Sequence, residues 1–469
     1  MKYTLTLLLF LAMHGALAQG GSSKLTLPAV QILRSGKKDI RYTVNNGGRQ
    51  PVKLQMDKRP VRVDIECREN GSLAGFYTGA DSIAFVIKEG EQTRLLVLVG
   101  RMRDTAIIDV VGIASNTAFS DAFVKQHKGK TETAVPEVLE LVNIAVLLSP
   151  SGAGIIMTDK TTPYYKEVQE HFSAYHNHPL VTTIDRKIGY GDKATKCRAY
   201  ENWALNACAA TFRGSKIVGS DAIKNMASPG SPSPVAEYAA LLESFAAESG
   251  FREFYKNHAG YYASVNKTYT QLCPARKMQS WLEKIFRRQY GCYNVYVSPL
   301  MCGPHRVRHF DDKSMSMTLF MAGAVQPDSA VSTMQNEVQY SGPIFSDMGR
   351  NYSVPLSGFH AHLIETTFSV SKWSNQKYVP YGGAPVSEIG LFNDYMAAAL
   401  FSLYCADNFT TAGYEPYISR LETEMEQQNG CVNFKAFNRK AMALYSGNKK
   451  ITADELFKQM LLWSYNYRK

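Results

Sequence analysis

The residues with the clearest potential for chemistry lie in the segment 359–370, which contains two histidines and one glutamate. In the pattern His-Glu-x-x-His, two imidazoles one helical turn apart bind zinc, and the glutamate polarises a metal-bound water. Here Glu365 can take the place of that glutamate, and the two ligand positions then hold Ile364 and Phe368. Neither of these side chains can donate an electron pair. The segment therefore has the spacing of a metallopeptidase helix without its ligands.

A second assignment of the same segment uses His360 and His362 as metal ligands. Residues two apart on a helix point about 200° apart, so these histidines can share a metal only on an extended segment. His362 and Glu365 do lie on one helical face. His305 and His309 offer further imidazoles, although a Gly-Pro dipeptide and strand-like neighbours argue against a helix there. A non-standard zinc site built from these residues is the alternative prediction.

The N-terminus predicts export. Lys2 is followed by an apolar run over residues 3–13 and by Ala-Leu-Ala at 16–18, which together have the form of a cleaved signal peptide, residues 1–18. No later stretch is long and apolar enough to predict a transmembrane segment. We therefore expect a soluble protein that is periplasmic, attached to the cell surface or secreted.

The formal net charge of +11 comes from basic residues scattered along the chain rather than gathered in a stripe. No nucleic-acid-binding motif accompanies them, so the charge favours solubility and affinity for anionic surfaces over nucleic-acid binding. The eight cysteines include no Cys-x-x-Cys pair. Export permits disulfides, and Cys405–Cys431 and Cys292–Cys302 bracket predicted turns. Buried free thiols explain the cysteines equally well.

Patterning predicts an α+β fold with two parts. Residues 24–115 alternate polar and apolar side chains between Gly-containing turns, which predicts a β-sandwich-like domain of five to seven strands. Residues 134–469 are mainly helical with a small sheet. The clearest predicted strands of the first domain are Asp39–Val44, Val61–Glu66, Ser82–Ile87, Arg94–Val99 and Thr105–Val111.

Two helices of the second part matter for the site. The segment with Glu365 is expected to begin a helix near Pro355 and to end it by Ser374. The segment Leu391–Phe401 is apolar on nearly every helical face, which predicts a buried helix.

Several segments between residues 135 and 465 resemble exported bacterial proteins grouped as domain of unknown function 4932. Residues 137–144 have the pattern Glu-Val-x-Glu-Leu-x-Asn-Ile, and residues 164–179 have Tyr-Tyr-x-x-Val-x-x-x-Phe-x-x-Tyr-x-x-His-Pro. Further likeness lies around Phe245–Tyr261 and at Val295–Pro299. In that family one helix carries His-Glu-Phe-x-His-Ser-Phe and a following helix carries Asn-Glu-x-x-x-Arg-Ala. The resemblance implies a zincin-like fold, and in the family a zinc peptidase whose third ligand is a glutamate.

Transferred to this chain, the resemblance places Ile364 and Phe368 on the two histidines, Glu365 on the general base and Asp394 on the third ligand. Ser369 falls on the serine and Ala398 on the arginine. One carboxylate cannot hold a catalytic zinc that normally has three protein ligands, so no cofactor is expected. In this assignment Ile364, Phe368 and Asp394 should converge on one point. Glu365 should be buried and neutral beside the apolar pair.

Three functions follow as hypotheses. The first is a catalytically inactive peptidase homologue that binds a peptide, protein or glycan in the former cleft. The second is an active metallopeptidase or other hydrolase that uses zinc at a non-standard site. The third is a structural or adhesive envelope protein in which the N-terminal β-domain does the binding.

Overall fold

The structure is a computed structural model of the chain. It describes residues 29–467 apart from 36–38, 45–49, 55–58, 68–71, 79–80, 101–103, 115, 156–157, 228–231, 304, 313 and 382–385. The predicted signal peptide at residues 1–18 lies outside the described residues. Two separate hydrophobic clusters form, one from residues 33–110 and one from residues 119–461.

The N-terminal domain consists of two four-stranded sheets, with the orders β1-β7-β8-β4 and β3-β2-β5-β6. Their inward-facing side chains, among them Leu33, Ile65, Phe76 and Leu95, form the smaller hydrophobic cluster. Most strand pairs are antiparallel, whereas β1 lies parallel to β7 and β4 parallel to β8. The strands are β1 Ala29–Ser35, β2 Asp39–Val44, β3 Gln50–Lys53, β4 Val61–Cys67, β5 Ser72–Tyr77, β6 Ser82–Ile87, β7 Gln92–Val99 and β8 Asp104–Ala114.

The second part is built around a four-stranded sheet of order β13-β14-β12-β9, in which only the edge strand β13 is antiparallel. Its strands are β9 Thr131–Ala134, β12 Cys292–Ser298, β13 Arg306–Asp311 and β14 Ser316–Gly323. Side chains alternate across β12, so Tyr293 and Ser298 lie on opposite faces. Tyr293 accepts a hydrogen bond from Asn351 of a long helix, and Ser298 donates to Glu140 of another. Helices thus cover both faces of the sheet.

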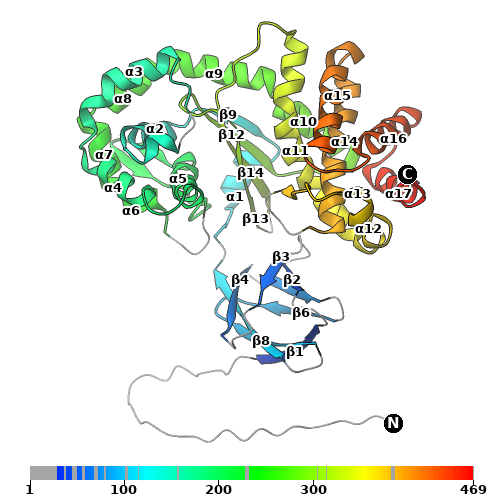
Figure 1. The fold of residues 1–469 in the computed structure, drawn as a ribbon. Helices are drawn as coiled ribbons and strands as arrows, with labels where there is room; N and C mark the ends of the chain where they lie inside the picture. Colours follow the sequence, from blue (N-terminus) through cyan, green and yellow to red (C-terminus); the bar gives the residue numbers. More distant parts are fainter. Residues whose placement is uncertain are drawn as a thin grey trace, which may run out of the picture.

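Figure 1 shows the sheet between one group of helices, α2 to α8, and a second group, α10 to α17. The first group, with α1 before it and α9 after it, consists of α1 Asp121–His127, α2 Glu137–Leu148, α3 Pro163–Phe172, α4 Pro179–Ile188, α5 Lys193–Cys208, α6 Pro234–Glu237, α7 Ala239–Glu248, α8 Phe251–Asn257 and α9 Ala259–Leu272. The second consists of α10 Ala275–Phe286, α11 Thr333–Phe359, α12 Ala361–Thr367, α13 Val370–Trp373, α14 Glu388–Asn408, α15 Thr411–Gln427, α16 Phe434–Gly447 and α17 Ala453–Asn466. The predicted α+β fold class is confirmed.

Helix α14 is buried along most of its length, as its apolar sequence predicts. By length and composition it is also long and apolar enough to cross a membrane, but most of its surface is covered by other parts of the chain. That degree of burial is typical of the core helix of a globular domain.

The helix around residues 355–374 differs from the prediction. Helix α11 begins at Thr333, where Ser332 and Gln335 form a capping box, and it runs through Pro343 and Pro355 to Phe359. The sequence predicts a helix start near Pro355, because proline lacks the N–H that a helix interior needs. Packing of α11 against α10, α14 and α15 outweighs that loss. The segment that follows is divided into two short helices, α12 and α13.

All eight cysteines are free thiols, so the structure has neither Cys405–Cys431 nor Cys292–Cys302 as a disulfide. Of the two explanations that the sequence allows, the structure agrees with the one based on free thiols. Burial raises the pKa of the Cys292 thiol and of the Cys431 thiol to about 12, which keeps both protonated.

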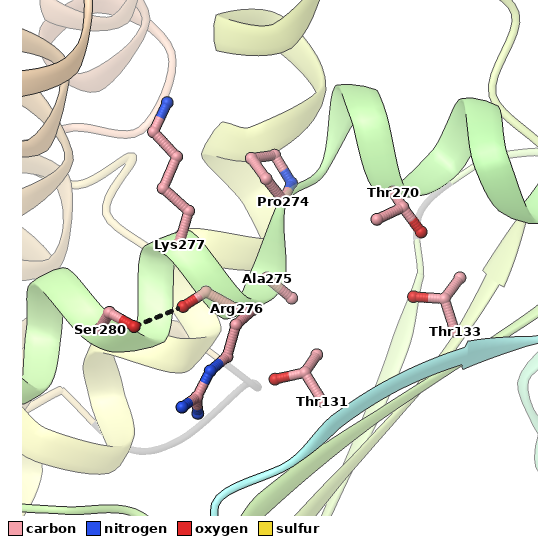
Figure 2. A pocket seen from close by; sticks show the side chains of 8 residues that line it. All are labelled: Thr131, Thr133, Thr270, Pro274, Ala275, Arg276, Lys277 and Ser280. Atoms are coloured by element: carbon pink, nitrogen blue, oxygen red, sulfur yellow. Dashed lines mark hydrogen bonds between the residues drawn. The ribbon is translucent and has the colours of Figure 1, made fainter.

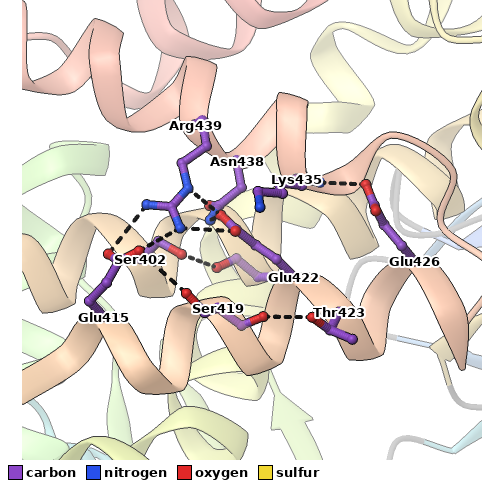
Figure 3. Close-up of polar contacts among 10 residues, drawn as sticks. Ser402, Glu415, Ser419, Glu422, Thr423, Glu426, Lys435, Asn438 and Arg439 are labelled. Carbon is purple, nitrogen blue, oxygen red and sulfur yellow. Dashed lines mark hydrogen bonds and ion pairs between the residues drawn. The ribbon is translucent and has the colours of Figure 1, made fainter.

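A charged network joins α15 and α16 (Figure 3). The Arg439 guanidinium lies 2.6 Å from Glu415 Oε1 and 2.7 Å from Glu422 Oε1. Glu422 is only 2% exposed and also accepts a hydrogen bond from Asn438 Nδ2 at 2.8 Å. The buried carboxylate is therefore compensated by one cation and one amide, which fixes the register of the two helices.

We expect Arg439→Met to lower the free energy of unfolding by about 2 kcal/mol, because it leaves Glu422 buried without a cation. Urea titration followed by far-UV circular dichroism reports on the helical part. Arg420→Met is the matched control, since Arg420 forms an exposed pair with Glu424 at 3.7 Å and should cost less than about 0.5 kcal/mol. Equal losses in both variants would contradict a special role for Arg439.

Candidate functional site

The two apolar positions of the predicted zinc helix lie in the hydrophobic core. Ile364 and Phe368 are fully buried, and the Phe368 ring stacks on Trp373 with a centroid distance of 5.0 Å. The same ring contacts Phe392 and Tyr395 of α14 edge-on. Helix α12 ends at Thr367, so Phe368 is already its C-cap with φ −113° and ψ 76°. A His-Glu-x-x-His pattern needs one continuous helix across both ligand positions, and α12 does not provide it.

Glu365 is exposed, which contradicts the expectation that it is buried. The reason is helical geometry. Ile364 and Phe368 both face inward, and each residue advances about 100° around the axis, so the position after Ile364 turns towards solvent.

The alternative ligands His360 and His362 do not form a metal site either. His360 Nε2 lies 2.6 Å from Asp454 Oδ1 at the start of α17, and His362 is exposed. The pKa of Asp454 is lowered, first by its hydrogen bond with Lys458 and then by the one with His360. These side chains connect the end of α11 to α17.

Asp394, in contrast, lies at a polar centre between α11 and α14. Its Oδ1 is 2.8 Å from Arg350 Nη1, and its Oδ2 accepts a hydrogen bond of 2.6 Å from the Tyr378 hydroxyl. The Arg350 and Asp394 side chains are 15% and 11% exposed, so the pair is largely removed from water. Asp394 thus faces α11 and not the segment of α12 that holds Ile364. The expected convergence of Ile364, Phe368 and Asp394 is not seen in these contacts.

A second carboxylate belongs to the same centre. Asp347, one turn before Arg350 on α11, has its Oδ2 2.5 Å from His305 Nε2, and its Oδ1 accepts a hydrogen bond from the Tyr381 hydroxyl. The Arg350 guanidinium stacks on the Tyr381 ring at 3.9 Å. Burial, and then the neighbouring carboxylate, raises the pKa of the Tyr381 phenol, so it stays a hydrogen-bond donor. We call His305, Asp347, Arg350, Tyr378, Tyr381 and Asp394 the α11–α14 centre.

Of His305, which directly precedes β13, and His309 within the strand, only His305 contacts a carboxylate of this centre. His309 Nδ1 lies 3.0 Å from Thr318 Oγ1, which also accepts a hydrogen bond from Asn351 Nδ2. The sequence pattern points to His305, His309 and Asp394 as candidates but not to Asp347 and Arg350. The one sequence feature that could have indicated the last two is the spacing of an acid and a base one turn apart on α11. This spacing becomes informative only once the structure places Asp394 opposite Arg350.

The donor set of the centre does not fit a zinc ion. Among the described residues no group of three or more His, Cys, Asp and Glu side chains is arranged to hold a metal. Within the centre a guanidinium, which has no lone pair to donate, contacts the carboxylate that would be a ligand. Its positive charge would also oppose a divalent cation at this place.

A second buried network lies on the other face of the sheet. Glu140 of α2 is fully buried, and its carboxyl group accepts hydrogen bonds from Tyr164 (2.8 Å) and Ser298 (2.7 Å). Ser298 in turn accepts one from Asn143 Nδ2 at 2.9 Å, and Tyr200 donates to the Asn143 amide oxygen. Glu140, Asn143, Tyr164 and Ser298 come from three of the segments that carry the resemblance described above. The network joins α2, α3, α5 and β12.

Comparison of the chain with protein-family models, with curated proteins and with solved structures finds no match. The membership in the 4932 group therefore stays a prediction.

We expect a stability change with pH that depends on Glu140. Burial raises its pKa from 4.5 to about 7, against smaller opposing effects of its hydrogen bonds with Ser298 and Tyr164. An acid whose pKa is raised on folding stabilises the fold fully below its unfolded pKa, and this stabilisation is lost as pH rises to the folded pKa. Between about pH 4.5 and 7 the loss should reach about 3 kcal/mol.

The test compares urea unfolding of the wild type and of Glu140→Gln across this pH range. The variant cannot ionise at this position, so the difference between the two proteins should change by about 3 kcal/mol. Glu170→Gln, at an exposed position of α3, is the control. Its free energy of unfolding should depend on pH in the same way as that of the wild type. A Glu140→Gln profile parallel to the wild type would refute the assignment.

The Arg350–Asp394 pair should show strong coupling. Arg350→Met leaves Asp394 buried without its cation and should cost about 3 kcal/mol in the free energy of unfolding. In the double variant Arg350→Met/Asp394→Asn no charge of the pair remains, so most of that loss should be recovered. A double-mutant cycle measures the coupling, and strictly additive costs would show that the two charges do not interact.

Proposed function

We propose that the chain is a zincin-like protein in which the guanidinium of Arg350 takes the place of the metal ion, and that it acts by binding rather than by hydrolysis. The observation that carries the proposal is the 2.8 Å contact between Arg350 and Asp394. Asp394 is the position that the resemblance assigns to the third zinc ligand. The group that contacts the Asp394 carboxylate is the guanidinium of Arg350, a fixed cation on α11.

This contact defines a new register for the zinc motif. If Arg350 stands at the second histidine, Ser346 stands at the first and Asp347 at the glutamate. The two phenylalanines of His-Glu-Phe-x-His-Ser-Phe then fall on Met348 and Tyr352, which are both buried and apolar in character. Helix α11 is continuous across all these positions, as the motif requires. The register on α11 therefore replaces the one on Ile364 and Phe368.

The chemistry of the replaced positions favours binding. A guanidinium stays protonated in proteins and cannot exchange a bound water for substrate. Both oxygens of Asp347 already accept hydrogen bonds, from His305 and Tyr381, so this carboxylate is not free to act as a base. Arg350 Nε is buried and makes no hydrogen bond to a described residue. A buried donor without a partner is unusual in a purely structural ion pair and is consistent with a converted catalytic centre.

The binding partner that best suits this geometry is an extended peptide. Strand β13 is an edge strand of the sheet, and within the described residues it pairs only with β14. An edge strand offers its free backbone groups to a further strand. The strand follows directly after His305, so a peptide paired with β13 would pass beside the centre. As an exported protein, which the N-terminus predicts, the chain would meet such peptides outside the cytoplasm.

We expect the wild type to retain far less than one zinc ion per chain after dialysis against zinc. The fourfold variant Ser346→His/Asp347→Glu/Arg350→His/Asp394→Glu should retain about one, because it restores three ligands and the base. The control Ile364→His/Phe368→His tests the earlier register and should retain none. Zinc is measured by mass spectrometry and folding by circular dichroism.

The outcomes separate the two parts of the proposal. Stoichiometric, chelator-sensitive zinc in the wild type would overturn the absence of a metal centre. Zinc in the control but not in a folded fourfold variant would overturn the register on α11.

A further inference from the structure

A pocket of about 410 Å³ lies where the end of α10, the second half of α11 and the start of α17 meet. Its walls are largely apolar and include Phe286, Pro355, Leu356 and Phe359. Phe359 is 86% exposed, so a ligand that covered this ring would remove a large apolar surface from water. The volume is within the range of small-molecule sites.

Two adjacent arginines, Arg287 and Arg288, line the same pocket. Both are exposed, and neither forms an ion pair with a described residue. The acidic side chains nearby already have partners. Asp454 lies 2.6 Å from His360 Nε2 and 2.7 Å from Lys458 Nζ.

Glu455 is another acidic side chain near Arg287, and it is part of the capping box of α17. The pKa of Glu455 is lowered first by its hydrogen bonds with Thr452 and then by the charge of Arg287. The guanidinium groups therefore remain available to an anion from outside.

A second cavity gives a useful contrast. It measures about 480 Å³ and is lined by Thr131 and Thr133 of β9 together with residues of α9 and α10 (Figure 2). There Arg276 lies beside Thr131 but donates to the Gly129 carbonyl at 2.6 Å and to Gln279. Lys277 points away from the threonines and pairs with Glu337. Both cations of that cavity thus already have partners within the protein.

We propose that the pocket between α10, α11 and α17 binds a small anion with an apolar body, such as an aromatic phosphate or carboxylate. The two guanidinium groups suit the planar, bidentate recognition of a phosphate or carboxylate. Leu356 and Phe359 cover the body of the ligand. Tyr352 and Leu356 lie about 200° and 240° around α11 from Arg350, so this site faces away from the α11–α14 centre. It does not depend on the function proposed for that centre.

The experiment is isothermal titration calorimetry of the full mature chain with three probes: phenyl phosphate, inorganic phosphate and benzyl alcohol. Phenyl phosphate should bind at least about tenfold more tightly than either other probe, because only it uses both the arginines and the apolar wall. Arg287→Gly/Arg288→Gln should weaken it by at least about tenfold. Glycine is tolerated at position 287, where φ is +50°. Phe359→Ser should reduce phenyl phosphate to the affinity of inorganic phosphate.

Arg186→Gln/Lys187→Gln, on α4, removes the same charge elsewhere and should leave binding unchanged.

Flotation with phosphatidylglycerol and phosphatidylcholine vesicles identifies the source of the anion. If phosphatidylglycerol vesicles alone capture the protein, and Arg287→Gly/Arg288→Gln abolishes this capture, the anion is a membrane headgroup. Binding of phenyl phosphate without vesicle capture would assign it to a soluble molecule. The proposal is overturned if phenyl phosphate binds no more tightly than inorganic phosphate. It is also overturned if Arg287→Gly/Arg288→Gln and the control Arg186→Gln/Lys187→Gln have the same affinity for phenyl phosphate.

Discussion

The helical part of the molecule depends on how the acidic residues of one buried helix are compensated. Helix α14 is apolar on nearly every face and packs against α11, α15 and α16. A carboxylate in such a helix is costly unless another element supplies a cation or hydrogen-bond donors. Asp394 receives them from Arg350 and Tyr378, and Asp407 receives them from Trp281, Tyr445 and Lys449. These bonds tie α10, α11 and α16 to defined points along α14.

The same arrangement recurs on the other side of the sheet. Helix α2 is buried along most of its length and carries one fully buried acid, Glu140. Its partners are neutral hydroxyls from α3 and β12, and burial raises its pKa to about 7. The contrast with Asp394 is informative. A guanidinium contacts Asp394, whereas only neutral hydroxyls donate to the Glu140 carboxyl group, so that the proton of Glu140 becomes part of its network. In both cases the polar contacts select one rotation of an otherwise apolar helix.

The sequence was sufficient for elements whose pattern is local. Alternation predicted β2 and β6 with their observed bounds, and the uniform apolarity of residues 391–401 predicted burial of α14. Strands β1, β3 and β5 were missed. The sequence predicts a helix start at Pro355, because proline strongly disfavours the interior of an isolated helix. The packing that keeps α11 intact depends on residues distant in sequence, so it is not visible in the local pattern.

The candidate site was harder to predict for a related reason. Glu365 has the position of the glutamate in a His-Glu-x-x-His motif. Whether its side chain is buried, however, depends on which face of α12 packs against α14. Arg350 belongs to no recognisable motif, and its meaning comes only from Asp394, which lies on a different helix. A catalytic centre converted as we propose would lose the residue types by which such centres are found, so only geometry could identify it.

On the proposed function, the guanidinium explains why an acid can occupy position 394. If the ligand positions opposite Asp394 had become apolar, as the earlier register on Ile364 and Phe368 required, this carboxylate would be buried without compensation. That arrangement costs several kcal/mol, on the order of 3–5 for a broken buried pair. A guanidinium at position 350 supplies a fixed positive charge and donors in a planar arrangement, so Asp394 and the tyrosines around it can keep their places. On this proposal, the guanidinium would preserve the electrostatic balance of a former metal centre, and with it the shape that depends on that balance.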